Sequence, residues 1–117
     1  MTIKIAFLGD IFGTPGRRVV QQQLPRLRAD HAPDVIIANG ENASQGLGLS
    51  PDLYRKFRAL GIDGLTLGDH VFRESRIVQV LQDPAEPIAR PANLPSAAAG
   101  REWLRVPLPG LDRSVFV

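Results

Sequence analysis

Three apolar runs of the sequence each end in polar residues whose side chains could bind a metal ion or transfer a proton. Asp10 follows the first run, Glu41 and Asn42 follow the second, and Asp69 and His70 follow the third. Carboxylates that lie close together raise one another's pKa values unless a cation neutralises them. Divalent metals relieve this repulsion, and carboxylate and amide oxygens suit Mn, Mg or Fe. A histidine beside such ions could protonate a leaving oxygen.

The same residues also have structural interpretations that involve no ligand. Asp10 could cap the turn that follows its run. Glu41 and Asn42 follow Gly40 and could form a turn with it. The pair Asp69–His70 could cap the start of a helix. Their joint occurrence after three successive runs favours one shared site over three separate turns.

The elements that must position these residues alternate between strands and helices. Apolar runs with β-branched residues predict strands over residues 3–9, 35–38 and 62–67, the first of them covered on both faces. Apolar residues at helical spacing predict helices around residues 20–27, 53–60 and 73–81. Parallel strands connected in this way bring their carboxyl ends to one edge of the sheet. The sequence therefore predicts an α/β fold that gathers the three polar groups in one crevice.

Prolines and glycines mark where these helices begin, bend and end. Pro25 lies inside the first helical pattern and should kink or split that helix. Ser50 is a good N-cap for the second helix, with Pro51 at its first position. Gly61 stands where a left-handed C-cap residue belongs.

After Pro84 the pattern is weaker. Residues 88–94 predict a short strand or a loop, and residues 103–106 predict an edge strand that Pro107 ends. Residues 114–117 have the character of a strand that is just beginning, so we expect the chain to stop inside a fold.

Several other residues have structural roles as their favoured interpretation. We expect His31 to be solvated, or to interact with a helix C-terminus, rather than to bind a metal. Tyr54 and Trp103 are expected to pack against other residues. The loop Gly13–Gly16 opens a helix and could face an anion, but it has neither the spacing nor the lysine of a P-loop.

Composition narrows the class of protein. The 117 residues fit one domain, with 44% apolar and 22% charged residues, which argues against wholesale disorder. The absence of cysteine excludes disulfides and thiolate metal sites. The net charge is only +2 and the arginines are scattered, so a mixed-charge surface is favoured over a nucleic-acid groove. The sequence shows no membrane span and no secretory leader, and predicts a cytoplasmic protein.

Four short motifs fall in order along the chain: GDIFG at 9–13, NGENA at 39–43, LGDH at 67–70 and RPANLP at 90–95. Together they resemble the YmdB-like metallophosphoesterases, a branch of the calcineurin-like phosphoesterases. The resemblance extends over essentially the whole chain. It implies the N-terminal half of a metallophosphoesterase-type α/β sandwich, with a parallel β-α-β-α-β sheet and flanking helices.

The resemblance also implies an activity and a role for each site residue. Such an enzyme hydrolyses phosphate esters, 2′,3′-cyclic nucleotides among them, with a hydroxide bound to two divalent ions such as Mn, Fe or Mg. By resemblance Asp10 would bind one ion, Glu41 would take a position shared by both, and Asn42 would contact a ligand or support Glu41. Asp69 would occupy a metal-binding position, and His70 would protonate the leaving group.

Two departures from the family pattern stand out. Asp69 replaces a metal-binding asparagine, which adds negative charge to the site. The family's domain is also longer and supplies further histidines from its second half, whereas His31 and His70 are the only two in this sequence. We therefore expect residues 1–117 to form a single, incomplete metallophosphoesterase-like domain.

Two other functions stay open at the level of sequence. The chain could be a catalytically incomplete fragment that binds a partner, either a second copy of itself or a complementary C-terminal half, because half a sheet leaves an exposed edge. It could also be a nucleotide-binding half-domain that uses the loop Gly13–Gly16 to hold an anion without a metal.

Overall fold

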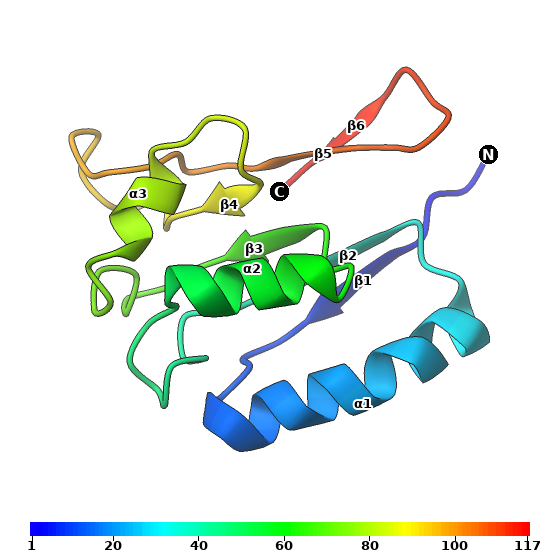
Figure 1. The fold of residues 1–117 in the computed structure, drawn as a ribbon. Coiled ribbons are helices and arrows are strands. Elements are labelled where there is room, and N and C mark those ends of the chain that lie inside the picture. Colours follow the sequence, from blue (N-terminus) through cyan, green and yellow to red (C-terminus); the bar gives the residue numbers. More distant parts are fainter.

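A parallel sheet of four strands forms the centre of the computed structural model, which describes residues 1–117 (Figure 1). Across the sheet the strands are β1 (Ile5–Leu8), β2 (Val35–Asn39), β3 (Gly64–Thr66) and β4 (Ile88–Ala89). The register pairs Ala6 with Ile36, and Ala38 with Leu65. The predicted α/β fold, with parallel strands and flanking helices, is confirmed.

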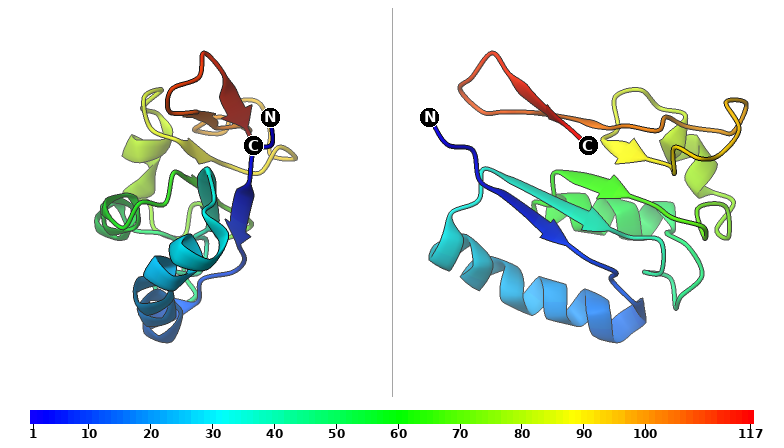
Figure 2. Two further views of the ribbon diagram at one scale, coloured as in Figure 1. Left: turned by 90° about the vertical axis from the view of Figure 1, so that its right-hand side faces the viewer. Right: turned by 180° about the vertical axis from the view of Figure 1, so that it is seen from behind.

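The helices α1 (Gly13–His31), α2 (Pro51–Ala59) and α3 (Ile77–Leu81) connect these strands and lie on one side of the sheet (Figure 2, left). Ile36 and Leu65 point toward this side and belong to a buried cluster with Leu24 of α1, Phe57 of α2 and Ile77 of α3. The helices are therefore held by the same apolar layer that covers this face of the sheet.

The other face of the sheet is covered by an antiparallel pair, β5 (Arg105–Pro107) and β6 (Ser114–Phe116). Val35 and Ile37 of β2 form a second buried cluster with Leu104 and Val106. Gly64 permits this close packing, because a Cβ at this position would lie 2.8 Å from a methyl group of Leu104. The two segments with weak strand patterns, residues 103–106 and 114–117, thus contribute the strands of a β-hairpin.

The prediction that the first strand is covered on both faces is wrong. Ile5 is 52% exposed and Phe7 is 55% exposed, whereas Val35 and Ile37 on the neighbouring strand are fully buried. The physical reason is position: β1 lies at the edge of the sheet, and the buried cluster on this face involves β2 and β4 but not β1.

The boundaries of α2 agree with the predicted caps, whereas α1 and α3 differ from the prediction. The Oγ of Ser50 accepts a hydrogen bond from the Leu53 N–H at 3.2 Å, and Gly61 has a φ of +89° after α2. Pro25 does not split α1, which runs without a break over 19 residues. The third helix begins only at Ile77, since the preceding residues form turns.

None of these helices combines the length and the apolar character that crossing a membrane would need.

Candidate metal site

The polar residues singled out by sequence lie at the carboxyl ends of β1, β2 and β3, which point toward the same end of the sheet (Figure 2, right). Backbone hydrogen bonds hold the loops together there. The N–H of Ile11 donates to the carbonyl of Asn39 at 3.3 Å, and the N–H of Gly40 donates to the carbonyl of Thr66 at 3.0 Å. Each loop after a strand is therefore attached to the end of the next strand.

Glu41, Asp69 and His70 come together at this edge. One potential ligand atom from each side chain lies within 4.8 Å of the others. The backbone N–H of His70 donates to the Glu41 carboxylate at 3.4 Å, and the His70 Nε2 lies 3.9 Å from Asp69 Oδ2. The Asp69 side chain is 88% exposed, so the cluster opens to solvent on its side.

The electrostatics of this cluster favour a bound cation. Burial raises the pKa of Glu41, and the neighbouring Asp69 carboxyl group raises that pKa further. The backbone N–H of His70 acts in the opposite direction and lowers it. Two carboxyl groups and an imidazole in this arrangement are a donor set that suits a divalent ion, which would remove the repulsion between the acids.

Asn42 connects Asp10 with His70. Its Nδ2 donates to Asp10 Oδ1 at 2.9 Å, and its Oδ1 lies 2.5 Å from the His70 Nδ1. Because a carbonyl oxygen only accepts hydrogen bonds, the proton in the second contact belongs to Nδ1. This contact orients the imidazole and leaves Nε2 on the side of Asp69, available to a ligand or to a proton.

The loop that carries Glu41 and Asn42 is held from several directions. The Oδ1 of Asn39 accepts a hydrogen bond from the Glu41 N–H at 3.3 Å. The guanidinium of Arg17 donates to the carbonyl of Ala43. The first contact is local to the loop, whereas the second depends on how α1 and the loop after β2 lie against each other.

Gly68, in the LGDH motif, is a further residue that supports the site. A Cβ at this position would collide with both carboxylate oxygens of Glu41, so a larger residue would require that carboxylate to move. The signal was present in the sequence, since Gly68 directly precedes Asp69 and His70, but its meaning depends on the position of Glu41 in space.

The loop Gly13–Gly16 offers little to an anion. The N–H of Gly13 donates to the carbonyl of Asn42 at 3.1 Å, and the N–H of Gly16 donates to the carbonyl of Phe12 at 3.0 Å. Two of the backbone donors that a phosphate would need are therefore already used within the protein.

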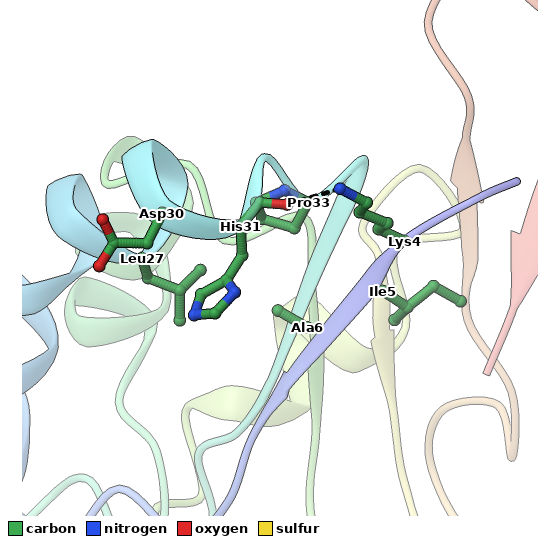
Figure 3. Close-up of a pocket in the computed structure, with 7 residues that line it drawn as sticks. All are labelled: Lys4, Ile5, Ala6, Leu27, Asp30, His31 and Pro33. Atoms are coloured by element: carbon green, nitrogen blue, oxygen red, sulfur yellow. Dashed lines mark hydrogen bonds between the residues drawn. The ribbon is translucent and has the colours of Figure 1, made fainter.

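Two depressions flank β1 at its opposite ends. A groove of about 590 Å³ runs beside Asp10 and is lined by Phe7, Ile11 and Val19, among others. A pocket of about 330 Å³ lies at the other end, where His31 stands near Lys4 (Figure 3).

His31 takes no part in the candidate site. The Lys4 Nζ donates to the carbonyl oxygen of His31 at 3.2 Å, and the side chain of His31 is exposed. The 19 residues of α1 span about 28 Å and separate His31 from the carboxyl edge of the sheet.

Comparison with known proteins was made on the whole chain. A model of the family described as YmdB-like protein matches residues 6–117. A 2′,3′-cyclic-nucleotide 2′-phosphodiesterase of Bacillus subtilis (strain 168) is 34% identical over 97% of this chain and 43% of its own length. A hypothetical protein of Thermus thermophilus, of known crystal structure, has a TM-score of 0.85 at 35% identity, over 97% of this chain and 43% of its own.

A second crystal structure, described as a novel phosphatase of Mycoplasma pneumoniae, has a TM-score of 0.82 at 28% identity, over 92% of this chain and 40% of that protein. The chain thus spans less than half the length of these relatives. The match to the family model covers nearly all of the chain, and the sequence motifs and the fold agree with it. The chain therefore belongs to the YmdB-like family.

Proposed function

We propose that this chain contributes to a metal-dependent phosphodiesterase that hydrolyses phosphate esters, with 2′,3′-cyclic nucleotides as the substrate class. The observation that carries the proposal is the convergence of Glu41, Asp69 and His70, with ligand atoms within 4.8 Å, at the carboxyl edge of a parallel sheet. The name of the Bacillus subtilis relative supports the choice of substrate. In this proposal residues 1–117 form a single, incomplete metallophosphoesterase-like domain.

Two divalent ions, with Mn, Fe or Mg as candidates, would be held by Asp10, Glu41, Asn42 and Asp69. Glu41 and Asp69 offer carboxylate oxygens that lie beside each other. Asp10 offers a further carboxylate, whose Oδ1 accepts a hydrogen bond from Asn42. Divalent ions in such a site acidify water and neutralise charge on phosphoryl oxygens. Asn42 binds Asp10 and His70 at once, which fixes the spacing between a metal-binding residue and the proposed acid.

His70 supplies the proton in this proposal. Hydrolysis of a cyclic phosphate forms a bond between phosphorus and a water oxygen and breaks one bond from phosphorus to a ribose oxygen. The ribose oxygen leaves as a hydroxyl group only if it receives a proton. A protonated His70 Nε2 could donate that proton, while Nδ1 stays bound to the Asn42 carbonyl oxygen.

The exposed edge of β1 supports a proposal about partners. With Ile5 and Phe7 more than half exposed, the strand can pair with a strand of a second copy of this chain, or of a complementary C-terminal half.

Manganese binding tests the proposal directly. Free Mn²⁺ can be counted by electron paramagnetic resonance while the ion is titrated into wild-type protein and into Glu41→Gln, and hydrolysis of 2′,3′-cyclic AMP can be followed by phosphorus NMR. We expect Glu41→Gln to weaken Mn²⁺ binding at least fivefold, because the Coulomb energy between a unit charge and a divalent ion about 4 Å away is ~2–8 kcal/mol at effective dielectric constants of 80 to 20.

Asp112→Asn is a matched control, since Asp112 is an exposed acid in the turn between β5 and β6. This variant should bind Mn²⁺ as the wild type does. Equal Mn²⁺ affinity in all three proteins would contradict the proposed site, whatever the rate of hydrolysis.

A further inference from the structure

Phe12 is a large, solvent-exposed apolar side chain in the loop that follows Asp10. It occupies the N-cap position of α1, two residues after Asp10, and it is 57% exposed. A phenyl ring can neither bind a metal ion through a donor atom nor transfer a proton. An exposed ring next to polar site residues is instead a surface that an apolar part of a ligand can cover.

The ring is held in place by Gly46, in the loop between β2 and α2. A Cβ at Gly46 would lie 2.8 Å from Cε2 and 2.9 Å from Cζ of Phe12, so the ring occupies the space that any side chain at position 46 would need. Gly46 also has a φ of +80°, a conformation that favours glycine. The contact uses one edge of the ring, and more than half of the side chain stays accessible.

Backbone hydrogen bonds to Asn42 connect the surroundings of the ring with the candidate site. The carbonyl oxygen of Asn42 accepts hydrogen bonds from the N–H of Gly13 at 3.1 Å and from the N–H of Gly46 at 2.8 Å. Gly13 follows Phe12 in the chain, and Gly46 supports its ring. The side chain of Asn42 meanwhile contacts Asp10 and His70. A single residue therefore fixes the position of the ring relative to the groups proposed to act on phosphate.

We propose that Phe12 is a stacking platform for the nucleobase of a cyclic nucleotide whose phosphate lies at the cluster of Glu41, Asp69 and His70. This inference rests on the function proposed above and adds a specificity determinant to it. Bases of every kind stack on an aromatic ring, so the platform would favour nucleotides over phosphate esters without a base.

The test compares two ligands that differ only in the base: 2′,3′-cyclic AMP, and methyl ribofuranoside 2,3-cyclic phosphate, which has none. Binding to the 117-residue protein is measured by titration calorimetry with Mg²⁺ present. We expect Phe12→Ala to weaken binding of the nucleotide roughly fivefold or more. Binding of the base-free ligand should be unchanged. In the wild type, the ring protons of Phe12 should shift upfield in NMR spectra only with the nucleotide.

Phe116→Ala serves as the matched control, because Phe116 is 62% exposed on β6 and packs against Trp103, not against the site. The stacking platform would be overturned if Phe12→Ala weakened binding of both ligands equally, or weakened binding of neither. If wild-type protein binds both ligands equally, only the platform fails. If it binds neither, the proposed function fails as well.

Discussion

A substitution at Gly68 should change the candidate site while leaving the fold intact. A methyl group there would displace the Glu41 carboxylate, but the backbone of Gly68 does not have a positive φ, so alanine is compatible with it. We predict that Gly68→Ala weakens Mn²⁺ binding about as much as Glu41→Gln does. The free energy of unfolding should change by no more than about 1 kcal/mol, since loss of unfolded-state entropy on Gly→Ala offsets small local shifts. Paramagnetic resonance and urea unfolding measure the two quantities.

Gly9→Ala is the control for this prediction. A Cβ at Gly9 would meet no atom within 4 Å, and this glycine also has no positive φ. The variant should keep the Mn²⁺ affinity of the wild type. Unchanged affinity in Gly68→Ala would mean that the position of the Glu41 carboxylate does not matter for metal binding.

Asn42 sets the tautomer of His70. Its Oδ1 lies 2.5 Å from Nδ1, so neutral His70 should carry its proton on Nδ1. We predict that Asn42→Ala shifts neutral His70 toward the Nε2–H tautomer, because the acceptor that holds the proton on Nδ1 is lost. Nitrogen-15 NMR of the imidazole in mildly alkaline buffer distinguishes the two forms. Asn93→Ala, a change at an exposed asparagine, should leave the spectrum as it is, and a wild-type spectrum dominated by Nε2–H would refute the assignment.

At the residue scale, sequence predicted the convergence of Glu41, Asp69 and His70, whereas Asp10, expected in the same crevice, lies outside this cluster and binds Asn42 instead. The strand ends and the parallel topology were enough to bring Glu41, Asp69 and His70 to one edge. The bridge through Asn42 was not predictable, because it depends on side-chain rotamers of three loops. The role of Gly68 was equally hidden, since a missing Cβ has meaning only once the neighbouring carboxylate is placed.

At the scale of elements, a hydrogen bond between the side chains of Tyr54 and Glu86 attaches α2 to the segment before β4. Tyr54 is 2% exposed, and its hydroxyl donates to Glu86 Oε2 at 2.6 Å. We predict that Tyr54→Phe lowers the free energy of unfolding by about 1–2 kcal/mol at neutral pH, because the hydrogen bond to a carboxylate is lost. Urea unfolding monitored by circular dichroism gives this value.

The same contact predicts a pH dependence. Burial raises the pKa of Tyr54 above its ordinary value, and the Glu86 carboxylate raises it further. A group whose pKa is higher in the folded state stabilises the fold fully below its unfolded pKa, about 10 for tyrosine, and loses that contribution at higher pH. Wild-type stability should therefore fall more steeply above pH ~10 than that of Tyr54→Phe. Parallel stability curves for the two proteins in this range would disprove the coupling.

Two elements show where sequence patterns mislead. An apolar run predicts a strand but does not say which neighbours cover it, and β1 lies at an edge although its sequence is as apolar as that of a central strand. Pro25 removes one backbone donor from α1 and is exposed, and the rest of the helix keeps its hydrogen bonds and packs through Leu24.

At the scale of the whole molecule, the coverage of the sheet is unequal. Apolar clusters cover both faces around β2, β3 and β4, but the outer edge of β1 and its side chains Ile5 and Phe7 face solvent. An unpaired edge strand with an apolar face favours pairing with another strand. We predict that the 117-residue protein self-associates at high micromolar concentration, and that Phe7→Lys shifts it to the monomer. Size-exclusion chromatography with light scattering measures the mass, and Leu111→Lys, at an exposed residue between β5 and β6, should leave it unchanged. A wild-type protein that stays monomeric at every concentration would show that the edge of β1 does not pair with a partner. If Leu111→Lys reduced self-association as much as Phe7→Lys, the reduction would come from the added charge rather than from the change in β1.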